Sequence, residues 1–276
     1  AEATELIVLD GESVSLKVTT KDGYQFDYDN SPSYNSANLS LDGTQEDTEY
    51  AATITPHLSA SNTGETITFA TYDIGPKITD FTSNLKPEDN YAKVGLSANA
   101  SDSVGIVAWA ISTAQPTSDE AWNTLESSVT ELTSDTLNVT IQEPGKYYVY
   151  VKDTVGNVSV SEKAISIYQI NYLKGNESAT GTMASMLKVE NQKLTLPEVD
   201  YQYEGHSFKN WRGSTGTYED KGVMVANPEN TFVEDLTAVW SLNAHTYTVN
   251  YYLMGLDGNY PETATSSKEF FASYGS

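Results

Sequence analysis

Apolar and polar residues alternate with a period of two along most of this chain. Near the start, Val14, Leu16 and Val18 alternate with Ser15 and Lys17. Such alternation places apolar side chains on one face of an extended segment and polar ones on the other, so it predicts half-buried β-strands. The pattern recurs to the end of the sequence, and we therefore expect a mainly β fold class.

The first predicted domain is a β-sandwich over residues 1–75. Segments 52–55 and 66–69 have strand character, because β-branched and apolar residues alternate in them. Turn-rich stretches between the strands are 21–23, 30–32 and 41–43. The dipeptide Gly75-Pro76 closes the domain, since neither residue continues a strand ladder easily.

The second predicted domain covers residues 76–168. Its expected strands lie at 78–81, 94–98, 107–111, 137–141, 145–153, 158–160 and 165–167. Trp109 is expected in the middle of a core strand. A short helix is expected after Ser118, which can cap the acidic first turn of 119–122.

One segment of this domain carries a family resemblance. It runs from Pro144-Gly145-Lys146-Tyr147 through residues 150–153 to Gly156-Asn157-Val158. In this feature the domain resembles the bacterial Ig-like domains of Firmicutes surface proteins. We expect the sandwich of residues 1–75 to be Ig-like as well. The resemblance implies a hairpin turn in which Asp153 bonds the turn amides and Gly156 supplies a positive φ. We favour this structural role of Asp153 over calcium binding.

The third predicted domain covers residues 169–241. Its motifs are 168–172, Leu194-Thr195-Leu196-Pro197, the segment 203–211 with Gly205, Phe208 and Trp211, Tyr218, and the closing 236–240 with Trp240. In order and spacing they are similar to the Listeria–Bacteroides repeat of internalin-type surface proteins. The resemblance implies a small β-grasp-like repeat. Gly175-Asn176 stands where that family usually has two glycines.

An internal repeat supports this interpretation. Tyr168-x-Ile170-Asn171-Tyr172 recurs as Tyr247-x-Val249-Asn250-Tyr251. A second copy is therefore expected to start at His245 and to be cut off at Ser276, so that residues 245–276 hold only its beginning. Its segment 256–260 contains Asp-Gly-Asn and predicts a hairpin turn, since it lacks the further acidic ligands of a calcium loop.

Composition narrows the class of protein. The formal net charge is −23 and the pI is near 4.2, which argues against nucleic-acid binding. We interpret the acidity as a solvated surface rather than as scattered calcium sites, for which there is no motif. The absence of cysteine excludes disulfides and thiolate metal sites. No apolar run approaches the roughly 20 residues of a membrane helix, so no membrane insertion is expected.

The chain ends also shape the expectation about location. The sequence starts Ala1-Glu2-Ala3 without a basic and apolar leader, and it stops within the second repeat. We expect a fragment of a longer exported chain, located outside the cell, on the surface or in the wall of a Gram-positive-type bacterium.

Candidate chemistry is sparse in the sequence. The histidines are His57, at a predicted strand end, His206, inside the repeat motif, and His245, in a predicted linker. None of them lies in a nucleophile or metal motif. The glycine pair of segment 213–216 lacks the lysine of a phosphate loop. We expect no enzyme activity, no cofactor, no metal and no catalytic residue.

Aromatic and lysine side chains offer two further kinds of candidate site. Trp109, Trp211 and Trp240 are expected in cores. Trp122 is the weak candidate for an exposed, sugar-stacking residue, but the favoured role of Trp122 is a plug at the sandwich end. An internal amide bond between a lysine and an asparagine needs a buried lysine. The lysines considered, Lys17, Lys93 and Lys146, are expected to face solvent.

The predicted function is a non-catalytic cell-surface stalk or adhesion region that spaces or presents a binding tip. Two alternatives stay open: an accessory region of a large secreted glycosidase or protease, and a glycan-binding module. The expected partner is a host or bacterial surface protein or glycan of unknown identity, and the chain is expected to be a monomer. Resemblance of fold alone names no ligand.

Overall fold

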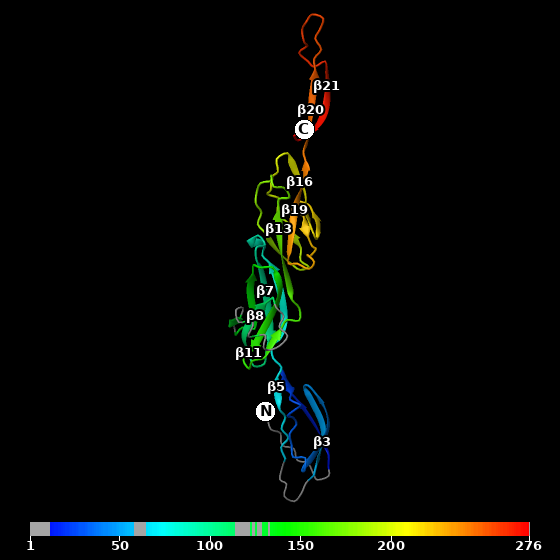
Figure 1. Cartoon of the computed structure of the whole chain (residues 1–276). Helices are drawn as coiled ribbons and strands as arrows, with labels where there is room; N and C mark the ends of the chain where they lie inside the picture. The colour runs from blue at the N-terminus through cyan, green and yellow to red at the C-terminus, as the bar shows by residue number, and fades with distance from the viewer. Residues whose placement is uncertain are drawn as a thin grey trace. The chain divides into compact units, whose positions relative to one another are not determined.

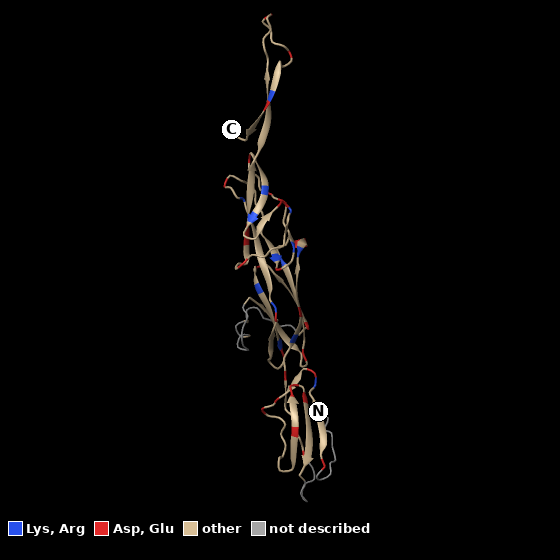
Figure 2. Ribbon diagram, turned by 90° about the vertical axis from the view of Figure 1, so that its right-hand side faces the viewer, with Lys and Arg blue, Asp and Glu red and all other residues tan. Residues whose placement is uncertain are grey.

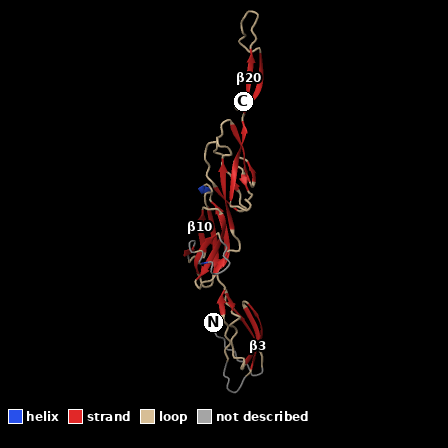
Figure 3. Cartoon of the chain, viewed as in Figure 1, coloured by secondary structure: helices blue, strands red, loops and turns tan. Residues whose placement is uncertain are grey.

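The computed structural model describes residues 12–57, 65–113, 122, 125, 129–131 and 133–275. Strands dominate this part of the chain, and the short helix η1 (Pro87–Asp89) is drawn in blue in Figure 3. The expectation of a mainly β fold is therefore confirmed. Within the described residues, no helix has the length and apolar character needed to cross a membrane.

The chain divides into two compact units. The first holds residues 1–81, 98–137 and 148–162, and the second holds residues 82–97, 138–147 and 163–276. The boundaries expected at residues 75 and 168 remain predictions.

The N-terminal strands of the first unit form two small sheets (Figure 1). One is antiparallel in the order β1 (Val14–Thr19), β4 (Glu49–Pro56) and β3 (Leu39–Glu46), and the other pairs β2 (Tyr24–Phe26) with β5 (Thr71–Asp73). Exposure alternates along β1 as the sequence pattern predicted. Phe26, Tyr50 and Ala52 form a buried cluster against which Val18, Leu41 and Phe69 pack.

Two expectations for this region are wrong. Residues 41–43, expected as a turn, lie inside β3, because Leu41 packs on the core and Gly43 pairs with Ala52. A β-carbon on Gly43 would lie 2.4 Å from the carbonyl oxygen of Ala51, so this glycine allows close approach of two strands. Residues 66–69, expected as a strand, make only an isolated bridge at Thr68, while Phe69 fills the core from an irregular segment.

The next strands follow the predicted pattern closely. One sheet has the order β10 (Thr136–Ile141), β7 (Val94–Ser101) and β6 (Lys77–Leu85). A nine-stranded sheet contains β9 (Val129–Glu131), β8 (Ile106–Ser112) and β11 (Gly145–Asp153), with β12 (Val158–Val160) paired to β11.

Burial in these strands agrees with the expected core. Exposure alternates along β7. Trp109 is fully buried and donates its indole N–H to the carbonyl oxygen of Ser134 at 2.8 Å, which confirms it as a core residue. The helix expected after Ser118 lies outside the described residues, apart from Trp122.

In the second unit, the central strand is β13 (Ile165–Leu173). It pairs antiparallel with the start of β11 and with β14 (Met186–Val189), and parallel with β19 (Val233–Leu242). Beyond β19 lie β16 (His206–Gly213) and β17 (Gly216–Tyr218), while β15 (Leu194–Thr195) pairs with β18 (Val223–Met224). The cluster packed on this sheet includes Tyr168, Ile170, Tyr172, Leu194, Leu196, Tyr201, Trp211, Met224 and Leu236.

The last element pair is an antiparallel hairpin of β20 (Ala244–Tyr251) and β21 (Ser266–Ser273). The predicted turn at 256–260 lies in the loop that joins these strands, and Gly258 has a φ of +81°. The expectation that His245 lies in a linker is wrong. His245 lies in β20 and pairs with Ala272 of β21.

Candidate functional site

Three aspartates form the candidate site of the first unit. Asp73 ends β5, Asp102 follows β7, and Asp153 ends β11. One carboxylate oxygen of each lies within 4.8 Å of the other two. Asp153 is 1% exposed, and the other two are half-buried. Among the described residues, this is the group of acidic or histidine side chains close enough to share a cation.

Asp153 organises the turn between β11 and β12. Its Oδ1 accepts hydrogen bonds from the backbone N–H groups of Val155 at 2.9 Å, Gly156 at 2.6 Å and Asn157 at 2.9 Å. Gly156 has a φ of +109°, which favours glycine. The predicted turn, with its bonding by Asp153 and its positive φ at Gly156, is confirmed.

Asp102 and Asp73 are held in similar ways. Oδ1 of Asp102 accepts the backbone N–H groups of Val104 at 2.9 Å and Gly105 at 2.8 Å. Oδ1 of Asp73 accepts the Ser103 hydroxyl at 2.6 Å, and its Oδ2 accepts the N–H of Gly75 at 3.0 Å. Most of the carboxylate oxygens in the cluster therefore already have donors.

Asn157 joins two members of the cluster directly. Its Nδ2 donates to Oδ2 of Asp153 at 2.8 Å and to Oδ2 of Asp73 at 3.0 Å. Burial acts to raise the pKa of Asp73, but hydrogen bonds with Ser103, Gly75, Asp153 and Asn157 outweigh it and lower that pKa below its ordinary value. These hydrogen bonds favour the ionised form of Asp73.

Oxygen ligands of this kind suit Ca²⁺, which prefers carboxylates and carbonyls. Asp73, Asp102 and Asp153 are the residues that could hold such an ion. The same oxygens accept internal hydrogen bonds, so the cluster is also satisfied as a purely structural network. Chemically the group can bind a cation or fix three turns, and it contains no histidine or nucleophile for catalysis.

Sequence reasoning found Asp153 and missed Asp73 and Asp102. Each of the three precedes a glycine by two or three residues, at Gly75, Gly105 and Gly156. That signal predicts three turns. It does not predict their convergence, because β5, β7 and β11 belong to three different sheets and a local pattern does not encode how these sheets pack.

Comparison with known proteins leaves the resemblances as expectations. The chain matches no protein-family model and no curated protein. These comparisons support neither the Ig-like domain nor the Listeria–Bacteroides repeat.

The tryptophans lie mostly as expected. Trp211 is fully buried, and Trp240 is half-buried and donates its indole N–H to the carbonyl oxygen of Lys174 at 2.8 Å. Trp122, the weak candidate for an exposed site, is only 9% exposed, with the ammonium of Lys152 5.5 Å from its ring centre. This burial agrees with the plug at the sandwich end, which the sequence favoured over an exposed, sugar-stacking ring.

An open polar depression lies in the second unit, with a volume of about 330 Å³. Its lining is Thr82, Ser83, Asn84, Lys86, Gly95, Leu96, Ser97, Asn138, Val139 and Thr140. Because no aromatic ring lines it, it lacks the stacking surface that sugar-binding sites use.

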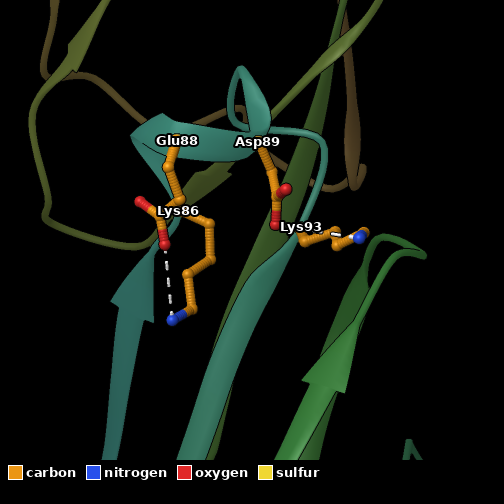
Figure 4. A network of polar contacts seen from close by, with 4 residues as sticks. All are labelled: Lys86, Glu88, Asp89 and Lys93. Carbon is orange, nitrogen blue, oxygen red and sulfur yellow. Dashed lines mark ion pairs between the residues drawn. The ribbon is translucent and has the colours of Figure 1, made fainter.

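Four charged side chains lie on or beside helix η1, next to this depression in the sequence (Figure 4). Lys86 pairs with Glu88 at 3.5 Å, and Lys93 pairs with Asp89 at 3.7 Å. Ion pairs as exposed as these contribute about 0–1 kcal/mol each, so we assign them no functional role.

The lysines divide into two kinds. Lys17 and Lys146 are solvent-exposed, as predicted, whereas Lys93 is half-buried with 41% of its side chain exposed. Lys188, which sequence reasoning did not weigh, has no exposed surface. The sequence contained a signal, because Lys188 lies in the run Met-Leu-Lys-Val, whose other three residues are apolar on both strand faces. The structure buries all four residues of β14.

Proposed function

We propose that this chain is a non-catalytic region of an extracellular bacterial surface protein, which spaces or presents a binding tip. The observation that carries the proposal is the way in which strand β13 is shared between neighbouring groups of strands. Residues 165–167 of this strand pair with β11, whereas residues 169–173 pair with β19. No loop separates the two halves of the strand.

The junction expected near residue 168 is therefore an ordered strand rather than a flexible linker. A connection of this kind transmits force and orientation from one group of strands to the next, which is what a spacer requires. Strand β14 pairs with residues 167–170, across the point where the partner changes from β11 to β19. Bending there would break these ladder hydrogen bonds.

The junction expected near residue 75 gains support of another kind. Asp73, just before Gly75-Pro76, is bonded through Asn157 and Ser103 to turns that are distant in the sequence. These hydrogen bonds restrain the segment on its N-terminal side. The carboxylate cluster fits a structural role in the same proposal.

Fold details also agree with the proposed family resemblances. The order β14, β13, β19, β16, with a parallel central pair, suits a β-grasp-like repeat. A three-stranded sheet together with the β9–β8–β11 strands suits an Ig-like sandwich. Surface location, a monomeric state and a protein or glycan partner belong to the same proposal.

Limited digestion of the whole chain with a broad-specificity protease tests the spacer. The loop between β20 and β21, residues 252–265, supplies an internal reference for accessible backbone. We expect cleavage in that loop to be much faster than cleavage at residues 74–77 or 165–173. Early cleavage at either junction would mean that the chain is hinged there and would argue against a spacer. Binding on a glycan array would instead favour the glycan-binding module.

A further inference from the structure

Lys188 is a charged side chain placed in an apolar setting. It lies in β14, opposite Tyr168 of β13, and its Nζ is 5.9 Å from the centre of the Tyr168 ring. Nζ donates to the backbone oxygen of Val189 at 3.2 Å and to Oδ1 of Asn227 at 2.5 Å. No carboxylate forms an ion pair with Lys188 within the part of the chain that the structure describes.

The amine of Lys188 is consequently easier to deprotonate than that of an ordinary lysine. Burial lowers its pKa to about 8, and the negative charge of exposed Glu190 only partly opposes this effect. A neutral lysine amine is a nucleophile, and desolvation in an apolar pocket is a recognised way to activate it.

The carboxamide of Asn227 is oriented beside this amine. Its Oδ1 accepts the backbone N–H of Asn191 at 3.4 Å, and its Nδ2 donates to Oδ1 of Asn191 at 3.3 Å. A carbonyl bond is about 1.2 Å long, so the carboxamide carbon of Asn227 lies no more than about 3.7 Å from Nζ of Lys188. Near-attack geometries have reacting atoms roughly 3–3.5 Å apart.

The residue after Asn227 prevents a competing reaction of the Asn227 side chain. Asparagine side chains commonly cyclise when the next backbone nitrogen attacks the carboxamide carbon. Here the next residue is Pro228, which has no backbone N–H. Lys188 is thus the intramolecular nitrogen nucleophile that the described structure places beside this carbon.

We propose that Lys188 and Asn227 join in an intramolecular amide bond. The Lys188 ammonium first gives one proton to water, and the neutral Nζ forms a bond to Cγ of Asn227. The N–H of Asn191 is placed to stabilise the negative charge that develops on Oδ1. A second Nζ proton passes to Nδ2, the Cγ–Nδ2 bond breaks, and ammonia leaves and takes up a proton from water.

No oxidant or cofactor is needed for this exchange of one amide for another. Oriented intramolecular reactions reach effective molarities of roughly 10⁵–10⁸ M, which is the factor that makes attack on an unreactive carboxamide feasible. Asn227 is half-buried, so ammonia has a route to solvent. The bond would tie β14 to the segment leading into β19, and both of these strands pair with β13.

Mass spectrometry of the purified, denatured full chain tests the bond. We expect an intact mass lower than the sequence mass by one ammonia. Trypsin should fail to cut after Lys188, and a branched peptide should join residues 175–193 to residues 222–268 through Lys188 and Asn227.

Variants assign the loss to these two residues. Lys188→Met and Asn227→Ala should each restore the sequence mass, whereas Lys193→Met, which changes an exposed lysine nearby, should still show the loss of ammonia. These masses are read on denatured protein. The proposal is overturned if the wild-type chain keeps its full sequence mass after prolonged incubation at mildly alkaline pH, or if the loss maps to other residues.

Discussion

The side chain of Asp153 is buried, and its carboxylate accepts three backbone N–H groups of the exposed turn that follows β11. Asp153→Ala leaves these donors without an acceptor, and we expect the free energy of unfolding to fall by about 2–4 kcal/mol. Asp153→Asn keeps one carbonyl oxygen and should lose less. Urea denaturation followed by fluorescence measures both. Equal stability of the alanine variant and the wild type would show that the turn does not depend on this carboxylate.

The carboxylate cluster also makes a prediction about calcium. Because internal donors already occupy most of its oxygens, we expect the melting temperature to be the same in excess Ca²⁺ and in EDTA. Differential scanning calorimetry makes this comparison, with Asp102→Asn as the matched variant. A rise in melting temperature with Ca²⁺ that disappears in Asp102→Asn would identify a metal site and refute the purely structural role.

Trp211 is the aromatic centre of the second unit. It is fully buried, with ring centroids of Phe208 at 5.0 Å, Tyr172 at 5.2 Å and Tyr201 at 6.1 Å. Trp211→Ala should cost about 3–5 kcal/mol and lower the circular dichroism melting midpoint sharply. Tyr247→Ala, at a half-exposed ring, is the control and should change the midpoint little. An unchanged melt for Trp211→Ala would contradict the core role.

Alkaline pH tests the burial of Tyr150. Burial raises its pKa to about 12, with a smaller contribution from Tyr148, against an unfolded value near 10. A pKa raised on folding gives stability that is complete below pH 10 and is lost as the pH rises towards 12. The free energy of unfolding should therefore fall by up to about 3 kcal/mol more in the wild type than in Tyr150→Phe. Equal pH dependence in the two proteins would argue against this burial.

At the scale of secondary-structure elements, strand β13 decides where the chain can be divided. Tyr168 is 7% exposed and belongs to the core cluster of the second unit. Fragment 169–241 lacks its ring, whereas fragment 165–241 keeps it. Because burying such a ring contributes about 1.5–3 kcal/mol, we expect the longer fragment to melt at a clearly higher temperature in calorimetry. Equal midpoints would place the domain boundary at Tyr168, as the sequence pattern predicts.

Alternation of apolar residues predicted β1, β7 and β10 because each strand has one buried face. The pattern failed at Phe69, which is apolar because it packs against the core and not because it lies in a strand. It also failed at Gly43, where the glycine allows two strands to approach closely and does not form a turn. Local patterns carry no information about which distant segments meet. The parallel pairing of β13 with β19 and the convergence of the three aspartates were therefore beyond prediction from the sequence.

At the scale of the whole molecule, the acidic surface charge and the buried polar networks have different effects. Acidic residues occur on strands and loops along the described chain (Figure 2), in keeping with the net charge of −23. Such a surface keeps a protein soluble and discourages self-association. The buried polar groups, around Asp153 and around Lys188, are instead matched by specific partners. The first property supports the monomeric, extracellular state proposed above, and the second fixes local geometry inside each unit.

The parallel pairing of β13 has a consequence for how the chain acquires its fold. Gln169 of β13 pairs with Val233 of β19, so a long stretch of chain must leave the ribosome before one edge of β13 is covered. Closing so large a loop is entropically costly, and contacts between residues far apart in sequence slow folding. During synthesis the antiparallel partners β11 and β14 reach β13 first, and the docking of β19 completes the sheet.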